Sequence, residues 1–217
     1  MTQIFFIGGS PCSGKSSVAA SIADTFDFNY FKVDDHLERY LAKGRLDGKP
    51  VCARVGGMTA DQIWMREPAI QMMEEFEIYR EIFAYVVQDL NDLRYRTRKA
   101  GIIAEGAAFL PELMAFLPEL MEKRGVGQQA YICMIPTSEF QNDHYRNRPW
   151  VADVLADCAD KAQAFSNWMM RDVLFARAVR MDAANKGYPC IITDGKTGIG
   201  ETVQQVCRSF GLTKGGR

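Results

Sequence analysis

Short apolar runs, each ending in a small or acidic residue, indicate where buried parallel strands are expected along the chain. The four clearest runs cover residues 4–7, 102–104, 131–135 and 190–193. A weaker run at 30–33 precedes Asp34 and Asp35. Stretches with helical periodicity lie between these runs, and such alternation predicts an α/β fold with a parallel sheet covered on both faces.

The connection between residues 36 and 100 is too long for a plain crossover between two strands. A polar stretch with several glycines comes first, and apolar residues then recur at three- and four-residue steps from Ala69 to Leu93. This periodicity predicts a long helix with one apolar face, which we interpret as helix packing. We therefore expect a helical lobe inserted at residues 36–100, beside the strand ends.

Composition limits the class of protein. The chain has 217 residues, of which 47% are hydrophobic and 24% charged, as in one ordinary domain of about this length, alone or with a smaller inserted lobe. Its 26 Lys and Arg nearly cancel its 27 Asp and Glu, so we expect neither nucleic acid nor a membrane surface as a partner. Residues 1–7 are interpreted as a strand and not as a signal peptide. Six scattered cysteines without a C-x-x-C pair favour a reduced, cytoplasmic protein.

Residues 9–16 read GSPCSGKS and match the phosphate-binding pattern G-x-x-x-x-G-K-[ST]. An apolar strand precedes this loop and a helix-compatible pattern follows it, as the mechanism requires. Backbone amides of the loop are expected to surround a β-phosphate at a helix N-terminus. Lys15 would then reach the β and γ oxygens, and the Ser16 hydroxyl would bind Mg²⁺. The predicted nucleotide-binding residues are Gly9, Ser10, Cys12, Ser13, Gly14, Lys15, Ser16 and Ser17.

The nucleotide is expected to be ATP. Proteins specific for guanine usually carry an N-K-x-D motif, and the nearest string, at residues 185–188, lacks the aspartate. The L-S-G-G-Q signature of transport ATPases does not occur in the sequence either. Both absences favour a small kinase over a GTPase or a transport motor.

Acidic residues follow two of the predicted strands, at the sheet edge where ligands collect in α/β proteins. Asp34 is predicted to take the proton of an attacking hydroxyl, and Glu105 to serve the metal or the substrate. The predicted metal ligands are Ser16, Asp34 and Glu105. Two simpler interpretations remain open, in which Asp35 caps a helix that begins at His36 and Glu105 is a buried acid satisfied by loop amides.

Arginines follow the strand at 131–135. Arg146 and Arg148 come just before Pro149, and we expect them to neutralise the transferring phosphate from a closing lid, with Arg171 as the next candidate. The alternative for each is a solvated surface charge. In the inserted lobe, Arg54 is a candidate for binding an anionic acceptor.

Taken in order, four segments of the chain resemble the nucleoside-monophosphate-kinase-like group of P-loop kinases. They are the loop at 9–16, the aspartate pair, the IIAEG segment at 102–106 and the basic stretch at 144–148. Within this group the chain is similar to shikimate, gluconate and chloramphenicol kinases and to 2-phosphoglycerate kinase-like proteins. The resemblance implies a three-layer P-loop NTPase sandwich with a five-stranded parallel sheet, a substrate lobe after the second strand and a helical lid, here at 137–172. The predicted substrate-binding residues are Asp34, Asp35, Arg54, Glu105 and Gly106.

We therefore expect an ATP- and Mg²⁺-dependent phosphotransferase that acts on a small metabolite bearing a hydroxyl or a phosphate. Two alternatives remain: a nucleoside monophosphate kinase, and a nucleotide-switched binding protein without an acceptor. Residues 214–217, with two glycines, are expected to form a frayed tail.

Overall fold

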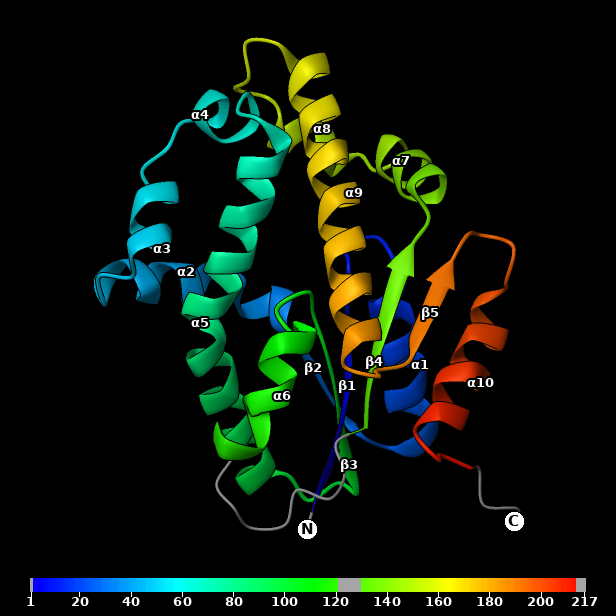
Figure 1. The fold of residues 1–217 in the computed structure, drawn as a ribbon. Helices are drawn as coiled ribbons and strands as arrows, with labels where there is room; N and C mark the ends of the chain where they lie inside the picture. Colours follow the sequence, from blue (N-terminus) through cyan, green and yellow to red (C-terminus); the bar gives the residue numbers. More distant parts are fainter. Residues whose placement is uncertain (1, 121–129, 214–217) are drawn as a thin grey trace.

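Five parallel strands form a single sheet in the order β2-β3-β1-β4-β5 (Figure 1). They were located in a computed structural model that describes residues 2–120 and 130–213, so the predicted tail at 214–217 lies outside the described residues. The strands are β1 (Gln3–Gly9), β2 (Asn29–Lys32), β3 (Gly101–Glu105), β4 (Ala130–Pro136) and β5 (Cys190–Thr193). Every predicted strand is present, although β2 ends one residue earlier than expected. Val33 instead begins a 3₁₀ turn, Val33–His36.

Helices connect the strands and account for most of the remaining described chain. They are α1 (Lys15–Phe26), α2 (Leu37–Leu46), α3 (Pro50–Val55), α4 (Ala60–Trp64), α5 (Pro68–Arg96), α6 (Pro111–Leu120), α7 (Ser138–Arg146), α8 (Trp150–Val154), α9 (Lys161–Asn185) and α10 (Ile199–Ser209). In the described ranges, none of them combines the length and apolar character that crossing a membrane requires.

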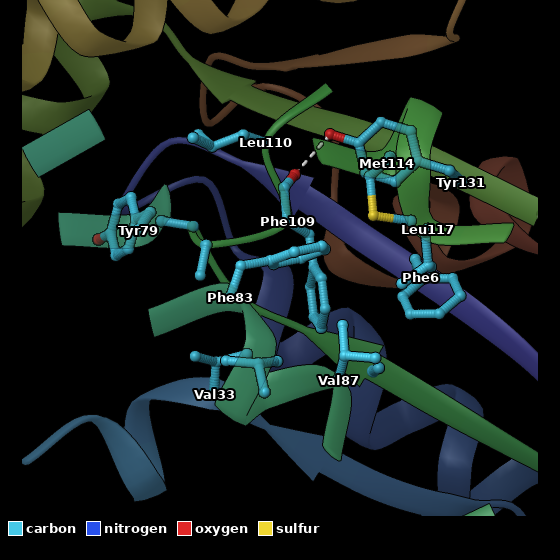
Figure 2. Packing of buried hydrophobic residues seen from close by; sticks show 14 of the residues in the cluster. Phe6, Val33, Tyr79, Phe83, Val87, Phe109, Leu110, Met114, Leu117 and Tyr131 are labelled. Carbon is cyan, nitrogen blue, oxygen red and sulfur yellow. Dashed lines mark hydrogen bonds between the residues drawn. The ribbon is translucent and has the colours of Figure 1, made fainter. Parts of the chain in front are cut away.

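Side chains that alternate along each strand divide the core between the two faces of the sheet. On one face Phe5 and Ile7 of β1 pack with apolar residues of α1 and α10. On the other face Phe6 packs with α5, α6 and α9, and its ring contacts Phe109 edge-on at 5.2 Å (Figure 2). Helices thus cover both faces, and the chain has the predicted three-layer α/β fold.

Between β2 and β3 the chain leaves the sheet and forms helices α2 to α5 (Figure 1). The long helix α5 packs alongside α9. It buries Tyr79, Phe83, Val86 and Leu90, as the periodicity predicted, whereas Met73 of the predicted stripe is 56% exposed. The packing of α5 on α9 places lobe residues beside the carboxyl ends of the strands.

Candidate active site

The loop at residues 9–16 folds tightly against β4. Gly9 has a φ of +118°, and a Cβ there would meet the Met134 carbonyl oxygen at 2.0 Å, so only glycine fits. The amide of Ser10 donates to the same carbonyl at 3.1 Å. At the other side, the Thr193 hydroxyl of β5 donates to the Ser13 carbonyl at 2.8 Å. Hydrogen bonds to β4 and β5 therefore hold the loop in place. Its last glycine, Gly14, has a φ of +83° and leads into α1.

Lys15 lies inside this loop. Its ammonium donates to the Ser10 carbonyl at 2.6 Å and lies 3.4 Å from the hydroxyl oxygen of Ser13, and its side chain is almost fully buried. Burial lowers the pKa of Lys15, and the negative charges of Glu105 and Asp34 oppose that shift. The loop thus positions a desolvated cation with two carboxylates near it.

Ser16 is joined to Glu105 across the sheet edge. The Ser16 hydroxyl donates to Glu105 Oε1 at 2.9 Å, and the Tyr30 hydroxyl donates to the same oxygen at 3.0 Å. Glu105 is only 1% exposed, and its second oxygen, Oε2, has no hydrogen-bond partner among the described residues. Burial raises the pKa of Glu105, and Lys15 partly reverses that shift. The interpretation of Glu105 as an acid satisfied by loop amides is wrong, because its described partners are two hydroxyl groups.

The aspartate pair lies in the 3₁₀ turn that follows β2. Both side chains are exposed, and Asp35 forms an ion pair with Lys32 at 3.4 Å instead of capping α2. No hydrogen bond or ion pair from another described residue holds the Asp34 carboxylate. Gly106 brings this turn to the end of β3, because a Cβ on it would lie 2.6 Å from Val33 Cβ. The structure thus gives Gly106 a packing role, and a substrate contact there stays a prediction.

Residues that follow β4 reach back over the phosphate loop. Gln141 of α7 donates to the Pro11 carbonyl at 3.3 Å, and Cys12 packs against a cluster built from α7, α8 and α9. The Arg148 guanidinium lies over the rings of Tyr145 and Trp150, 5.5 and 5.6 Å from their centroids.

The two predicted lid arginines line one surface pocket, and each also has contacts of its own. Burial raises the pKa of the Cys12 thiol, and the charge of Arg148 lowers it, so Arg148 lies near the loop. Arg146 is exposed and lines a surface groove with Arg177. A role in neutralising phosphate stays a prediction for both, and the geometry favours Arg148.

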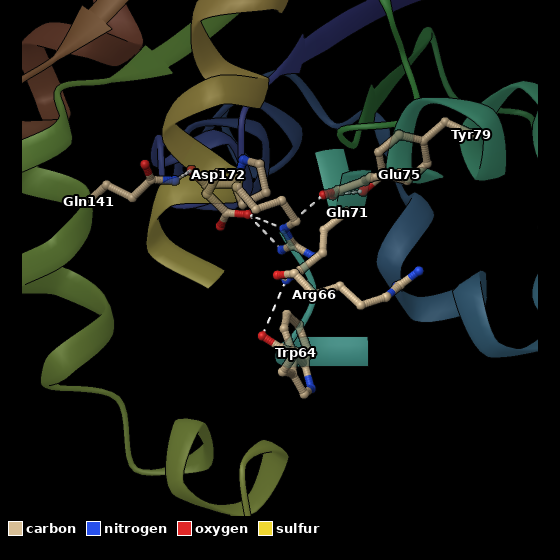
Figure 3. A network of polar contacts seen from close by, with 9 residues as sticks. Trp64, Arg66, Gln71, Glu75, Tyr79, Gln141 and Asp172 are labelled. Carbon is tan, nitrogen blue, oxygen red and sulfur yellow. Dashed lines mark hydrogen bonds and ion pairs between the residues drawn. The ribbon is translucent and has the colours of Figure 1, made fainter. Parts of the chain in front are cut away.

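A buried polar network that includes Glu75 of α5 and Asp172 of α9 connects these helices (Figure 3). Arg171 of α9 contacts both carboxylates. Its guanidinium bonds to Asp172 Oδ1 at 2.6 Å and lies 3.1 Å from Glu75 Oε2. The hydroxyl of Tyr79 donates to the other Glu75 oxygen at 2.9 Å. Because its charge is already matched by two carboxylates, the structure does not present Arg171 as a free cation for a phosphate.

The predicted acceptor-binding residue Arg54 is also ion-paired. It contacts Glu74, which Arg66 binds as well at 2.5 Å. Sequence reasoning gave no role to Glu75 or to Tyr30, and the only sequence signal for Tyr30 was its place in the strand before the aspartates.

The buried charge of Glu75 allows a test by pH. Burial raises the pKa of Glu75, Arg171 lowers it and Asp172 raises it, with a net upward shift. The contribution of Glu75 to the free energy of unfolding is then fully present below the pKa of a glutamate in the unfolded chain, about 4.3. It is lost as the pH rises through the pKa of Glu75 in the folded protein. The quantity to compare is the free energy of unfolding of Glu75→Gln minus that of the unchanged protein. This difference should be more positive at pH 7 than at pH 4. Urea unfolding across that range measures this difference.

Glu77→Gln is the matched control, because Glu77 lies on the same helix with its side chain 50% exposed. Its stability should follow that of the unchanged protein at every pH. Parallel curves for Glu75→Gln and the unchanged protein would show that Glu75 has an ordinary pKa.

No protein-family model and no curated protein matches this sequence. Solved structures that are similar to it include a shikimate kinase from Acinetobacter baumannii in complex with shikimate, at 16% identity and a TM-score of 0.48, covering 97% of this chain and 93% of that one. A gluconokinase from Sinorhizobium meliloti 1021 is similar at 13% identity and a TM-score of 0.48, with 97% and 91% covered. A shikimate kinase from Aquifex aeolicus has 15% identity and a TM-score of 0.42, with 96% of each chain covered.

Proposed function

We propose that this chain is an ATP- and Mg²⁺-dependent phosphotransferase that acts on the hydroxyl of a small metabolite. The observation that carries the proposal is the placement of Asp34. Its carboxylate is exposed and unheld by other described residues, yet its charge acts on both Lys15 and Glu105 in the phosphate loop region. A free carboxylate beside a phosphate-binding lysine is suited to accept a proton from an attacking hydroxyl.

Each residue of the site has a separate task in this reaction. The acceptor oxygen forms a bond to the γ-phosphorus while the bond from that phosphorus to the β,γ-bridging oxygen breaks, and ADP leaves. Asp34 takes the hydroxyl proton. Lys15 and the loop amides hold the phosphates, and Arg148 offsets the charge that spreads over the γ-phosphoryl oxygens.

Oxygen atoms suited to Mg²⁺ lie beside the loop. The Ser16 hydroxyl and Glu105 Oε1 are 2.9 Å apart, and Glu105 Oε2 is buried with no hydrogen-bond partner among the described residues. No group of three or more His, Cys, Asp or Glu side chains in the described chain forms a complete metal cage. This fits Mg²⁺, which usually keeps several waters and takes the rest of its ligands from one or two carboxylates and substrate phosphates. Ser16 and Glu105, with Asp34 near them, would hold it, and when bound it would neutralise charge between the β and γ oxygens.

Release of ADP in the presence of candidate acceptors tests the proposed activity. We expect ADP to form from ATP and Mg²⁺ with one class of hydroxyl-bearing metabolite and to stay at the background rate without an acceptor. The panel should contain sugars, polyols, sugar acids, glycerate, nucleosides and nucleoside monophosphates. Stimulation by a single nucleoside monophosphate would identify a nucleotide kinase instead, and ATP binding without turnover on any acceptor would contradict the proposal.

A further inference from the structure

Two cysteines lie side by side on neighbouring strands at one edge of the sheet. Cys133 of β4 and Cys190 of β5 are register partners, and the Cys133 amide donates to the Pro189 carbonyl at 2.9 Å. Register partners of a parallel pair point to the same face of the sheet, and both cysteines pack in the apolar cluster beneath α5, α6 and α9. Strands lie about 4.7–4.9 Å apart, so the two Cα atoms fall within the roughly 4.4–6.8 Å that disulfides span.

The two thiols differ in exposure and in acidity. Cys133 is fully buried and Cys190 is half-buried, so a small oxidant reaches Cys190 first. A hydrogen bond from Cys133 lowers the pKa of Cys190 to about 7 against the effect of burial, and the charge of Arg180 assists. The same hydrogen bond and burial raise the pKa of Cys133, which therefore keeps its proton. Because the thiolate is the reactive form of cysteine, Cys190 is suited to react first and Cys133 second.

Three other cysteines have the opposite property. Burial raises the pKa of the thiols of Cys12, Cys52 and Cys158. At neutral pH these thiols are less reactive than that of Cys190, so oxidation should be selective for β5 over their positions.

The surroundings of Cys133 tolerate the loss of its thiol proton. The Tyr131 hydroxyl lies 2.9 Å from Cys133 Sγ and donates to the Phe109 carbonyl at 2.7 Å. If Cys133 entered a disulfide, Tyr131 would keep this carbonyl as its partner. A disulfide would therefore leave no buried hydroxyl without a hydrogen bond, which would otherwise be costly.

Closing the disulfide would move β5. The β carbons of parallel register partners keep about the strand spacing of 4.7–4.9 Å, whereas those of a disulfide are about 3.8 Å apart, so β5 must approach β4 by about an ångström. As the edge strand, β5 pairs with β4 on one side. At its other end, three residues after Cys190, the Thr193 hydroxyl holds the Ser13 carbonyl of the phosphate loop at 2.8 Å. A movement of this short strand thus reaches the loop.

From this arrangement we propose that Cys133 and Cys190 form a reversible disulfide in the presence of hydrogen peroxide, and that its closure loosens the bond from Thr193 to the phosphate loop. The Cys190 thiolate attacks one peroxide oxygen, the O–O bond breaks, and the departing hydroxide takes up the proton that Cys190 had released. Cys190 is then a sulfenic acid. The Cys133 sulfur bonds to the Cys190 sulfur while the S–O bond breaks, and the hydroxyl leaves with the proton of Cys133 as water. Two thiols are oxidised to one disulfide, and one peroxide is reduced to two waters.

Peptide mapping of the full-length protein tests the disulfide. After brief treatment with hydrogen peroxide and alkylation of the remaining thiols, mass spectrometry should find Cys133 and Cys190 joined in one linked peptide, which dithiothreitol separates. Cys190→Ser should form no such link. Cys207→Ser is the matched control, because Cys207 is also half-buried but packs on the opposite face of the sheet, and it should link as the unchanged protein does. Thermal melting confirms that both variants are folded.

ATP binding before and after oxidation tests the effect on the loop. The dissociation constant for ATP should rise about two- to tenfold on oxidation, the effect of one weakened hydrogen bond, and should return with dithiothreitol. Cys190→Ser should show no such change.

The two measurements separate this proposal from the proposed function, on which only the effect on ATP rests. Recovery of Cys190 as a sulfinic acid, joined to another cysteine, or unmodified would overturn the disulfide. A linked peptide with unchanged ATP affinity would overturn the effect on the loop. Reduced protein that bound no ATP would contradict the proposed function, while a linked peptide would still support the disulfide.

Discussion

Replacing Asp34 by asparagine is expected to lower turnover by about 10²–10⁴-fold, the range that general acid–base catalysis contributes. The amide of asparagine has the size of the carboxylate but does not accept the proton of the attacking hydroxyl. ATP affinity should be nearly unchanged, because Lys15 and the backbone amides of the loop would hold the phosphates. Since Asp34 is exposed and unheld by other described residues, the fold should not depend on it. Single-turnover kinetics with saturating ATP, alongside equilibrium binding of ATP, measure both quantities.

Asp35→Asn is the matched control for this change. Asp35 adjoins Asp34 in the same turn and is also exposed, but it is committed to an ion pair with Lys32. We expect its replacement to leave kcat and stability nearly unchanged, since Asp35 is not the proposed base and exposed ion pairs contribute little stability. A raised KM for the acceptor alone would support the predicted substrate contact of Asp35. Equal losses in both variants would indicate that the turn has moved, and full activity of Asp34→Asn would place the base elsewhere. A protein that only switches with nucleotide would respond to ATP alike in all three forms.

The centre of the sheet was predictable because β1, β3 and β4 are buried on both faces. Such strands appear as continuous apolar runs, and the runs at 102–104 and 131–135 needed no knowledge of their neighbours to be found. The phosphate loop was predictable because its contacts are local: Ser10, Ser13 and Lys15 bind one another within six residues. A pattern that extends over one strand, one turn and one helix can be found in the sequence.

Side chains that meet across the fold were not predictable. From its sequence, Arg171 was a candidate for binding the transferring phosphate. One of its partners is Glu75, which lies almost a hundred residues earlier in the chain. Only the packing of α5 on α9 brings the two together. Arg146 and Arg148 line one surface pocket, but Arg148 stacks on Trp150 while Arg146 also lines a second groove. A run of charges alone does not indicate which of its members is already neutralised.

Replacing Lys15 by methionine is expected to lower turnover by about 10³-fold, similar to the loss of a preorganised electrostatic donor in other active sites. Methionine fills similar space without the charge that would reach the β and γ oxygens. The variant should lose some stability, because the Ser10 carbonyl loses its donor and the buried Glu105 loses a nearby cation, so thermal melting must first confirm that it is folded. Steady-state kinetics and ATP binding should both be affected, in contrast to Asp34→Asn, where only turnover falls. Lys43→Met, on the exposed surface of α2, is the control and should behave like the unchanged protein.

The same variant changes the electrostatics of the whole site in a measurable direction. Lys15 lowers the pKa of Glu105 against the effect of burial, so removing it should raise that pKa further. Carbon-13 NMR titration of the Glu105 carboxyl in metal-free protein measures the change. A pKa that stayed the same while turnover fell would mean that Lys15 and Glu105 do not act on each other. The assignment of Ser16 and Glu105 as the residues that would hold Mg²⁺ beside the phosphates would then lose its electrostatic support.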